Sequence, residues 1–253
     1  MSGFKRQAEL LHWHAYYDGW LFTLFRCLVK STEVGGLNGT RAEWFQRLSE
    51  RQYDRRFCVS TRGNVATEDL DVPDDRRKHA VEYLPTHASS IGWLLSTLPV
   101  ELSEFTFVDC GAGKGRVLLV ASEFPFRKVI GVELAHQLHI IASQNITNFQ
   151  SPRRQCEDVR SVNMDAADFE FPSEPLIVFL YNPFSEEITK LVVDNLMNSL
   201  DVNPRPVVVL YHNPVYTNLF EESSIFQENY ADCRPGQNWK IYSLKPVMNP
   251  ITN

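Results

Sequence analysis

A glycine-rich turn between residues 105 and 122 carries the clearest chemical signal in the sequence. In FTFVDCGAGKGRVLLVAS an apolar run ends in Asp109, and Gly111, Gly113 and Gly115 follow at a spacing of two before a helical pattern begins. Glycine admits positive φ and lets a ligand approach the backbone without an intervening Cβ. The N–H groups that open the next helix are free for an anionic group. The spacing favours a ligand-binding loop, although a tight turn without a ligand would use the same glycines.

Three more polar side chains follow apolar runs further along the chain. Glu133 ends KVIGVE, Asp165 follows VNM, and Asn182 opens Asn-Pro-Phe after LIVFLY. In open α/β sheets, ligands bind at the carboxyl ends of the strands, where an acid can accept both hydroxyls of a ribose. Each residue also has a plain structural explanation: Glu133 as an acid at a helix start, Asp165 as an N-cap, and Asn182 as a strand-ending turn.

The elements that must position these residues alternate regularly from residue 81 onward. Such alternation argues for βαβ units and a mostly parallel sheet. A closing pair of runs around the turn segment 233–238 indicates an antiparallel hairpin. We expect strands at 105–109, 128–133, 159–164, 176–181, 207–212, 224–230 and 239–245, and helices at 86–98, 114–123, 135–148 and 185–200.

The order D-x-G-x-G-x-G resembles the first motif of the class I S-adenosylmethionine-dependent methyltransferases. The dinucleotide fingerprint G-x-G-x-x-G would need glycine where Arg116 stands. The resemblance implies an α/β fold with a Rossmann-like, mostly parallel seven-stranded sheet, helices on both faces and a C-terminal antiparallel hairpin. It also implies that the loop holds the methionine part of the cofactor, Glu133 the ribose and Asp165 the adenine amine, with Met164 beside the ring. The predicted cofactor site comprises Tyr83, Thr86, Asp109, Gly111, Gly113, Lys114, Gly115, Glu133, Leu134, Met164, Asp165 and Asn182.

The segment Asn182-Pro183-Phe184 resembles the (Asn/Asp)-Pro-Pro-(Tyr/Phe) loop of methyltransferases that act on amino groups, with one proline missing. The class I protein-lysine methyltransferases also vary this motif around a polar residue and an aromatic one. Tyr83-Leu-Pro-Thr86 resembles their segment ahead of the first strand, which lies over the cofactor. The resemblance implies that Asn182, Pro183 and Phe184 form the catalytic loop, with Asn182 orienting the acceptor nitrogen and Phe184 forming a wall of the pocket.

For three further side chains the sequence allows two interpretations each. His212, at the end of the fifth strand, is either a proton relay or a histidine satisfied within the fold. Lys114 either takes part in the cofactor loop or faces solvent. Arg116 pairs with a carboxylate, which is either the protein's own or the cofactor's.

The first 80 residues differ in character from the rest. Residues 1–80 carry 13 basic and 11 acidic side chains, whereas residues 81–253 carry 12 and 20, within a total net charge of −6. We interpret 1–80 as a helical extension that caps the site or selects the substrate, and 81–253 as the catalytic domain. We expect amphipathic helices at 6–30 and 41–53 and a connecting loop at 54–80. The apolar stripe of the first helix, which includes Tyr17, Trp20 and Leu24, is expected to pack into the core.

Composition limits the partners. A hydrophobic fraction of 43% and a charged fraction of 22% are typical of a globular protein, and no apolar run approaches the length of a membrane span. Five widely spaced cysteines without a CxxC pair favour reduced thiols, no metal and a cytoplasmic location. The acidic balance makes nucleic acid a less favoured acceptor than a protein or a small molecule, although a basic patch near 51–62 or 76–78 could override it.

These patterns predict an S-adenosylmethionine-dependent enzyme that methylates a nitrogen, preferably on a protein side chain. A small-molecule N- or O-methyltransferase and a cofactor-binding regulatory protein without turnover remain alternatives. The sequence leaves the oligomeric state and the acceptor open.

Overall fold

The centre of the molecule is a seven-stranded sheet. We describe it from a computed structural model, in which residues 3–20, 23–24, 38–182, 184–234 and 237–245 are placed. The strand order is β3-β2-β1-β4-β5-β7-β6, and the first five strands are parallel. They are β1 (Thr106–Cys110), β2 (Lys128–Glu133), β3 (Val159–Asn163), β4 (Leu176–Tyr181) and β5 (Val207–His212).

The last two strands form the expected antiparallel hairpin. β7 (Gln237–Leu244) pairs antiparallel with β5 on one side and with β6 (Phe226–Arg234) on the other. The mostly parallel sheet with an antiparallel C-terminal hairpin is therefore confirmed. Both hairpin strands reach further toward the turn than the predicted 224–230 and 239–245, because pairing continues through Arg234 and Gln237.

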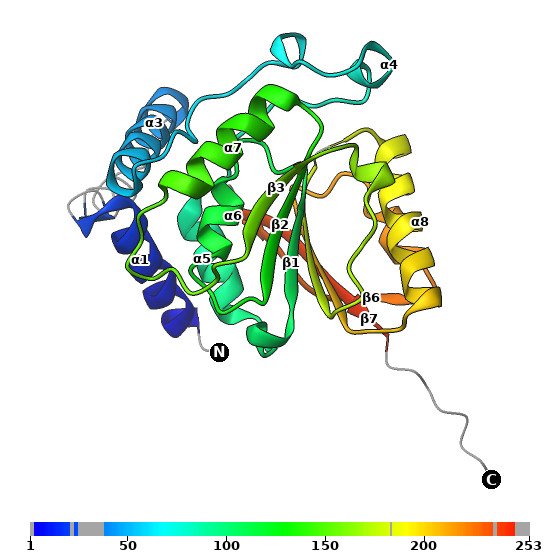
Figure 1. Ribbon diagram of the computed structural model, residues 1–253. Helices are drawn as coiled ribbons and strands as arrows, with labels where there is room; N and C mark the ends of the chain where they lie inside the picture. The colour runs from blue at the N-terminus through cyan, green and yellow to red at the C-terminus, as the bar shows by residue number, and fades with distance from the viewer. Residues whose placement is uncertain (1–2, 21–22, 25–37, 183, 235–236, 246–253) are drawn as a thin grey trace.

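Helices cover both faces of the sheet (Figure 1). Side chains alternate along a strand, so Ile177 and Phe179 of β4 pack into one buried cluster, and Val178 and Leu180 pack into another. The first cluster lies under α5 (Ala88–Thr97), α6 (Arg116–Ala121) and α7 (His136–Asn148), and the second under α8 (Glu186–Val202) and α9 (Asn218–Glu221). None of the described helices is long and apolar enough to cross a membrane.

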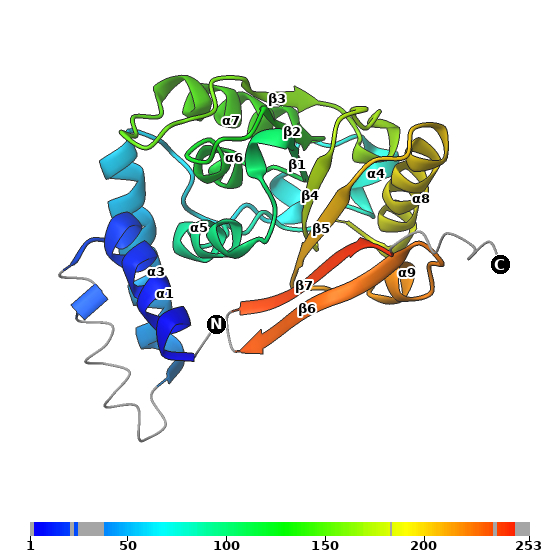
Figure 2. The same ribbon diagram turned by 90° about the horizontal axis from the view of Figure 1, so that it is seen from below.

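The N-terminal helices α1 (Gly3–Asp18) and α3 (Asn38–Phe57) stand beside α5 at one edge of the molecule (Figure 2). Tyr17, Tyr53 and Phe57 belong to the same buried cluster as the helices of that sheet face. The predicted helix 6–30 is wrong in its length. α1 ends at Asp18 because Gly19 adopts φ +87°. Beyond this break the predicted apolar stripe does not reach the core, since Trp20 and Leu24 are 67% and 58% exposed; residues 25–30 lie outside the described residues.

Residues 58–87, which we call the covering segment, run from α3 across the carboxyl ends of the strands (Figure 1). Within the predicted loop 54–80, α3 takes residues 54–57, and two short helices follow, η1 (Thr67–Asp69) and α4 (Asp74–Arg77). Isolated antiparallel bridges pair Val65 with Tyr83 and Ala80 with Phe184. The covering segment is therefore fastened to itself and to the loop after β4.

Candidate functional site

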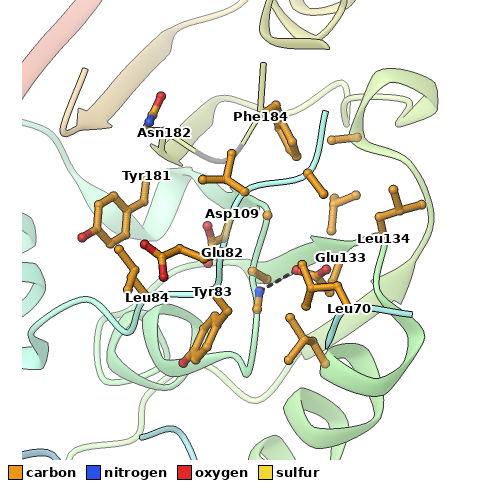
Figure 3. A pocket seen from close by; sticks show the side chains of 18 of the residues that line it. Leu70, Glu82, Tyr83, Leu84, Asp109, Glu133, Leu134, Tyr181, Asn182 and Phe184 are labelled. Carbon is orange, nitrogen blue, oxygen red and sulfur yellow. Dashed lines mark hydrogen bonds between the residues drawn. The ribbon is translucent and has the colours of Figure 1, made fainter. Parts of the chain in front are cut away.

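A cleft lies between the carboxyl ends of the strands and the covering segment (Figure 3). It encloses about 1140 Å³, its open mouth included. The structure brings most of the predicted site residues together around it. Those that line the cleft are Tyr83, Thr86, Asp109, Gly111, Gly113, Glu133, Leu134, Asp165, Asn182 and Phe184.

Three predicted residues do not border the cleft, and Pro183 lies outside the described residues. Lys114 turns away, because its Nζ donates to the backbone oxygens of Arg62 (2.8 Å) and Gly63 (3.1 Å). Met164 packs into the buried cluster under α8. Gly115 starts α6 at φ +82°, and a Cβ there would lie 3.1 Å from the Cβ of Ala142 in α7. Its role in this structure is to let two helices approach each other.

Gly113 is the tightest point of the glycine loop. It has φ +55°, and a Cβ there would lie 2.3 Å from two carbons of the Tyr83 ring. The ring is fixed in turn, because the Tyr83 hydroxyl donates to the backbone oxygen of Thr61 (2.7 Å) and the Lys114 ammonium lies 4.9 Å from its centroid. The sequence predicted that Tyr83 lies over the cofactor; in the structure its ring contacts the glycine loop that was assigned to the cofactor.

Two buried carboxylates face the cleft beside this loop. Glu133 Oε2 accepts from the Gly113 N–H (2.7 Å) and Oε1 from the Ala135 N–H (2.8 Å). Burial raises the pKa of Glu133 to about 7, against the lowering effect of these N–H groups. Burial and the nearby Glu133 charge raise the pKa of Asp109 well above its usual range, and its carboxylate has no hydrogen-bond or ion-pair partner among the described residues. Asp109 is therefore placed to receive a cation.

Asp165 already has partners on both of its oxygens. Oδ1 accepts from the Ala167 N–H (2.9 Å) and so caps a short 3₁₀ helix, η3 (Ala166–Asp168), while Oδ2 lies 2.9 Å from Arg76 Nε. The N-cap that the sequence left as an alternative is present, and the residue also lines the cleft. In the part of the chain that the structure describes, no group of His, Cys, Asp and Glu side chains is arranged to hold a metal ion.

The loop after β4 presents a strained polar residue to the cleft. Asn182 adopts φ +38°, and its Oδ1 is buried without a hydrogen-bond partner. Unpaired buried polar atoms are rare and indicate an absent partner. The loop is held by the covering segment: the Ser185 N–H donates to the His79 oxygen (3.2 Å), and His79 Nδ1 lies 2.7 Å from Ser185 Oγ.

His212 is unsuited to a proton relay. Its ring lies between Trp239, at a centroid distance of 4.0 Å, and Tyr181, at 4.3 Å. Burial, with a smaller contribution from His87, lowers the pKa of His212 to about 3. A neutral, stacked imidazole supports the Tyr181 ring at the wall of the cleft. Of the two interpretations, the structure therefore favours a histidine that packs within the fold over a proton relay.

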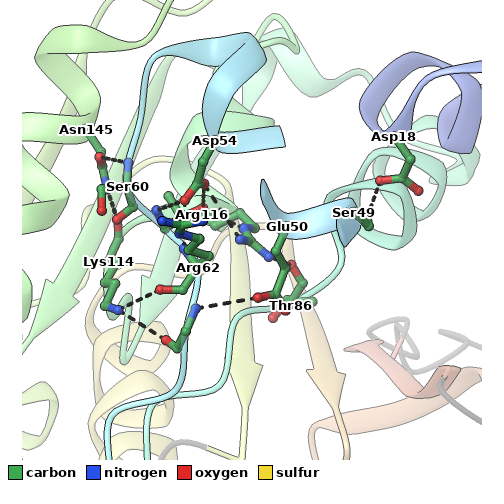
Figure 4. Close-up of polar contacts among 12 residues, drawn as sticks. Asp18, Ser49, Glu50, Asp54, Ser60, Arg62, Thr86, Lys114, Arg116 and Asn145 are labelled. Atoms are coloured by element: carbon green, nitrogen blue, oxygen red, sulfur yellow. Dashed lines mark hydrogen bonds and ion pairs between the residues drawn. The ribbon is translucent and has the colours of Figure 1, made fainter. Parts of the chain in front are cut away.

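Arg116 joins the glycine loop to the N-terminal helices (Figure 4). Its Nε donates to Thr61 Oγ1 (2.7 Å), its Nη2 lies 3.9 Å from Asp54 Oδ1, and its guanidinium carbon lies 5.2 Å from the Tyr53 ring centroid. The nearest carboxylate is thus the protein's own. The guanidinium also lines the cleft, and Nη2 is buried without a hydrogen bond.

Sequence reasoning found Tyr83 and Thr86 but missed the other residues that the covering segment contributes to the cleft. Arg76, His79 and Glu82 line the cleft, with the apolar Leu70 and Val72 beside them. Glu82 has no hydrogen bond or ion pair within the described chain, and its charge acts on Tyr181. The available signal was the sequence proximity of Glu82 to Tyr83 and Thr86, which were already assigned to the site.

Comparisons with known proteins found structural likeness only. No protein-family model matches the sequence, and no curated protein matches it. Among solved structures, a methyltransferase dependent on S-adenosylmethionine from Aquifex aeolicus is 13% identical, with a TM-score of 0.46 over 61% of this chain and 88% of that one. A TehB-like S-adenosylmethionine-dependent methyltransferase from Corynebacterium glutamicum is 14% identical, with a TM-score of 0.43 over 62% and 88%. An rRNA methylase from Streptococcus thermophilus is 12% identical, with a TM-score of 0.43 over 62% and 92%.

Proposed function

We propose that this protein is an S-adenosylmethionine-dependent methyltransferase that acts on a nitrogen of a protein side chain. One observation carries the proposal: the left-handed glycine loop, the Asp109 carboxylate, which has no partner among the described residues, and the strained Asn182 line the same cleft. The first two suit the amino-acid end of the cofactor, and the third suits an acceptor N–H. The glycine-loop motif of the sequence supports the same assignment.

The residues of the cleft fit the parts of this cofactor in order along the sheet edge. Asp109 is buried, and a ligand ammonium would supply the positive charge that it lacks. Glu133 uses one lone pair of each oxygen for backbone N–H groups and keeps others for ribose hydroxyls. Asp165 is oriented by its N-cap bond to accept the adenine amine, and Leu134 and Leu138 offer apolar surface to the ring.

When bound, the cofactor supplies a methyl group that is activated by a positively charged sulfur. The protein then has to position an acceptor nitrogen and keep its lone pair free. We assign to the Asn182 amide the role of accepting an N–H bond from the acceptor, because Asn182 lines the cleft together with Phe184 and Tyr181. Because the pKa of His212 is held near 3, this histidine does not remove the acceptor proton. We assign proton loss to solvent at the open mouth.

A protein acceptor is supported by the charge of the cleft. Glu82 lines it without a hydrogen bond or ion pair among the described residues, whereas the arginines that line it face carboxylates of the protein, Arg76 that of Asp165 and Arg116 that of Asp54. A phosphodiester entering such a cleft would be repelled, whereas a basic or neutral side chain would not. We therefore favour a side-chain nitrogen over a nucleobase.

Calorimetric titration with S-adenosylhomocysteine tests cofactor binding. We expect saturable binding in the micromolar range for the wild type and for Asn182→Ala. No heat and no thermal shift at high ligand concentration would refute the cofactor assignment.

Transfer of a tritiated methyl group in a cell extract tests the acceptor. We expect label in protein with the wild type, loss of labelling with Asn182→Ala, and full labelling with the control Asn218→Ala, which removes an exposed amide that does not line the cleft. Wild-type rates with Asn182→Ala would exclude the orienting role, and label in nucleic acid would exclude a protein acceptor.

A further inference from the structure

A row of arginines lies along the solvent-facing side of α3. Arg47, Arg51 and Arg55 are spaced by four residues, so they share one face of the helix, and all three are exposed. Among the side chains that the structure describes, which do not include those of residues 38–46, none forms a hydrogen bond or ion pair with these guanidinium groups. With the exposed Arg62, which follows the helix, we call them the arginine face.

The chain at Arg62 connects the end of α3 to the glycine loop, as Figure 4 shows for Asp54, Arg62 and Lys114. The Asp54 carboxylate accepts from the N–H groups of Thr61 (3.0 Å) and Arg62 (3.0 Å), which turns the chain back at the end of α3. Lys114, next to the glycine loop, then donates to the Arg62 oxygen. Arg62, the last residue of the arginine face, is therefore joined through its backbone oxygen to Lys114 of the glycine loop that borders the cleft.

Among the side chains that the structure describes, exposed acids are absent from residues 47–62 and from α7. The sequence of α7, His136–Asn148, contains no acid, and Asn145 of this helix bonds to the chain at Ser60. On α3, Glu50 and Asp54 lie next to the arginine row, three residues after Arg47 and Arg51, but both are buried and so are not part of the exposed face. Acids gather instead on the far part of the covering segment, where Glu68, Asp69, Asp74 and Asp75 are exposed. The approach to the cleft is thus positive on the α3 side and negative on the other.

We propose that the arginine face is a docking surface for an acidic segment of the protein substrate, a proposal that rests on the proposed function. Guanidinium groups bind carboxylates in a bidentate geometry, and a row of exposed, unpaired arginines offers several such sites at little desolvation cost. A protein can place acidic residues on the arginine face and a basic or neutral residue at the acidic mouth. A nucleic acid carries phosphates along its whole length, so its continuation across the covering segment would meet the acids there.

Fluorescence anisotropy with a labelled oligoglutamate peptide tests the proposal, with oligoglutamine and an oligouridylate of the same length as comparison probes. The wild type should bind oligoglutamate more tightly than either comparison probe, with an affinity that falls as salt rises. Arg51→Gln/Arg55→Gln should weaken this binding about tenfold.

The matched control is Arg127→Gln/Arg160→Gln, which removes two exposed arginines from the opposite end of the sheet. This variant should bind oligoglutamate as the wild type does. Equal weakening in both variants, or none in either, would overturn the proposal, and tighter binding of oligouridylate than of oligoglutamate would replace it with a nucleic-acid surface. Titration with S-adenosylhomocysteine separates this result from the proposed function, because all three proteins should bind that ligand equally.

Discussion

The cleft has two walls of different origin. The sheet wall consists of strand ends and the turns that follow them: the glycine loop after β1, Glu133 at the end of β2 and Asn182 after β4. The opposite wall is the covering segment, which has little regular structure and is held by single contacts such as Tyr83 to Thr61 and Ala80 to Phe184. One wall is fixed by continuous strand pairing, the other by isolated backbone bridges and individual side-chain contacts.

This difference teaches where each wall is vulnerable. In the sheet wall every functional residue sits next to a buried strand, so a side chain can be exchanged without loss of the frame. In the covering segment a few buried contacts hold the chain in place, as strand pairing does in the sheet. Among these, Asp54 receives both Thr61 donors and the Arg62 N–H. We expect the largest mutational effects where the two walls meet.

Asp54→Ala should have the largest effect. It removes the acceptor of two backbone N–H groups and of the Thr61 hydroxyl, and it leaves the buried Arg116 charge without its carboxylate. Loss of one partner of such a buried pair costs about 3–5 kcal/mol. Chemical denaturation measures the loss, and Asp54→Asn, which keeps the shape and one acceptor, should lose less. Equal stability of Asp54→Ala and the wild type would show that the covering segment is held by other contacts.

Gly113→Ala should come next, because it disturbs both walls at once. Alanine is strained at φ +55°, and its Cβ would displace the Tyr83 ring. We expect about 2–3 kcal/mol of destabilisation and weaker binding of S-adenosylhomocysteine. Gly63→Ala in the covering segment is the matched control: it has φ +78° but nothing within 4 Å of the new Cβ, so it measures backbone strain alone, about 1–2 kcal/mol. If the two variants lost the same free energy of unfolding, the Tyr83 contact would not contribute to the effect of Gly113→Ala.

The same contrast explains how much the sequence predicted. Strands β2, β4 and β5 were predicted to the residue, since buried parallel strands appear as continuous apolar runs. The strand-end rule then located Asp109, Glu133 and Asn182, which all line the cleft. Arg76 and Glu82 could not be found in this way, because the covering segment has no period and its side chains meet the site only through tertiary contacts. The break at Gly19 was missed because the apolar spacing continues past it.

The pH dependence of ligand binding tests whether Asp109 and Glu133 of the sheet wall contact the ligand. Burial raises the pKa of Asp109 and of Glu133, the latter to about 7, so the free protein holds protons there. A ligand ammonium and ribose hydroxyls favour the ionised carboxylates, so the complex binds fewer protons and binding releases them. Affinity for S-adenosylhomocysteine should therefore rise with pH, by up to about tenfold per pH unit for each carboxylate that loses a proton, and the contribution of Glu133 should level off above about pH 7.

Calorimetric titration in two buffers of different ionisation enthalpy measures the released protons. The control ligand is 5′-methylthioadenosine, which lacks the ammonium group and should release fewer. Proton uptake, or an affinity independent of pH, would mean that the carboxylates of the sheet wall do not meet the cationic end of the ligand.

The smallest effect is expected where the covering segment meets Asp165 through an ion pair. Arg76 is partly exposed, so its pair with Asp165 is screened by solvent and contributes at most about 1 kcal/mol. Arg76→Ala should weaken S-adenosylhomocysteine binding less than about fivefold at low salt, and the difference from the wild type should shrink as salt rises. Arg77→Ala is the neighbouring comparison, since Arg77 donates to the backbone oxygens of Leu70 and Val72 and holds the segment by hydrogen bonds. Its effect should persist at high salt, and an equally persistent effect of Arg76→Ala would show that Arg76 acts by packing and not by charge.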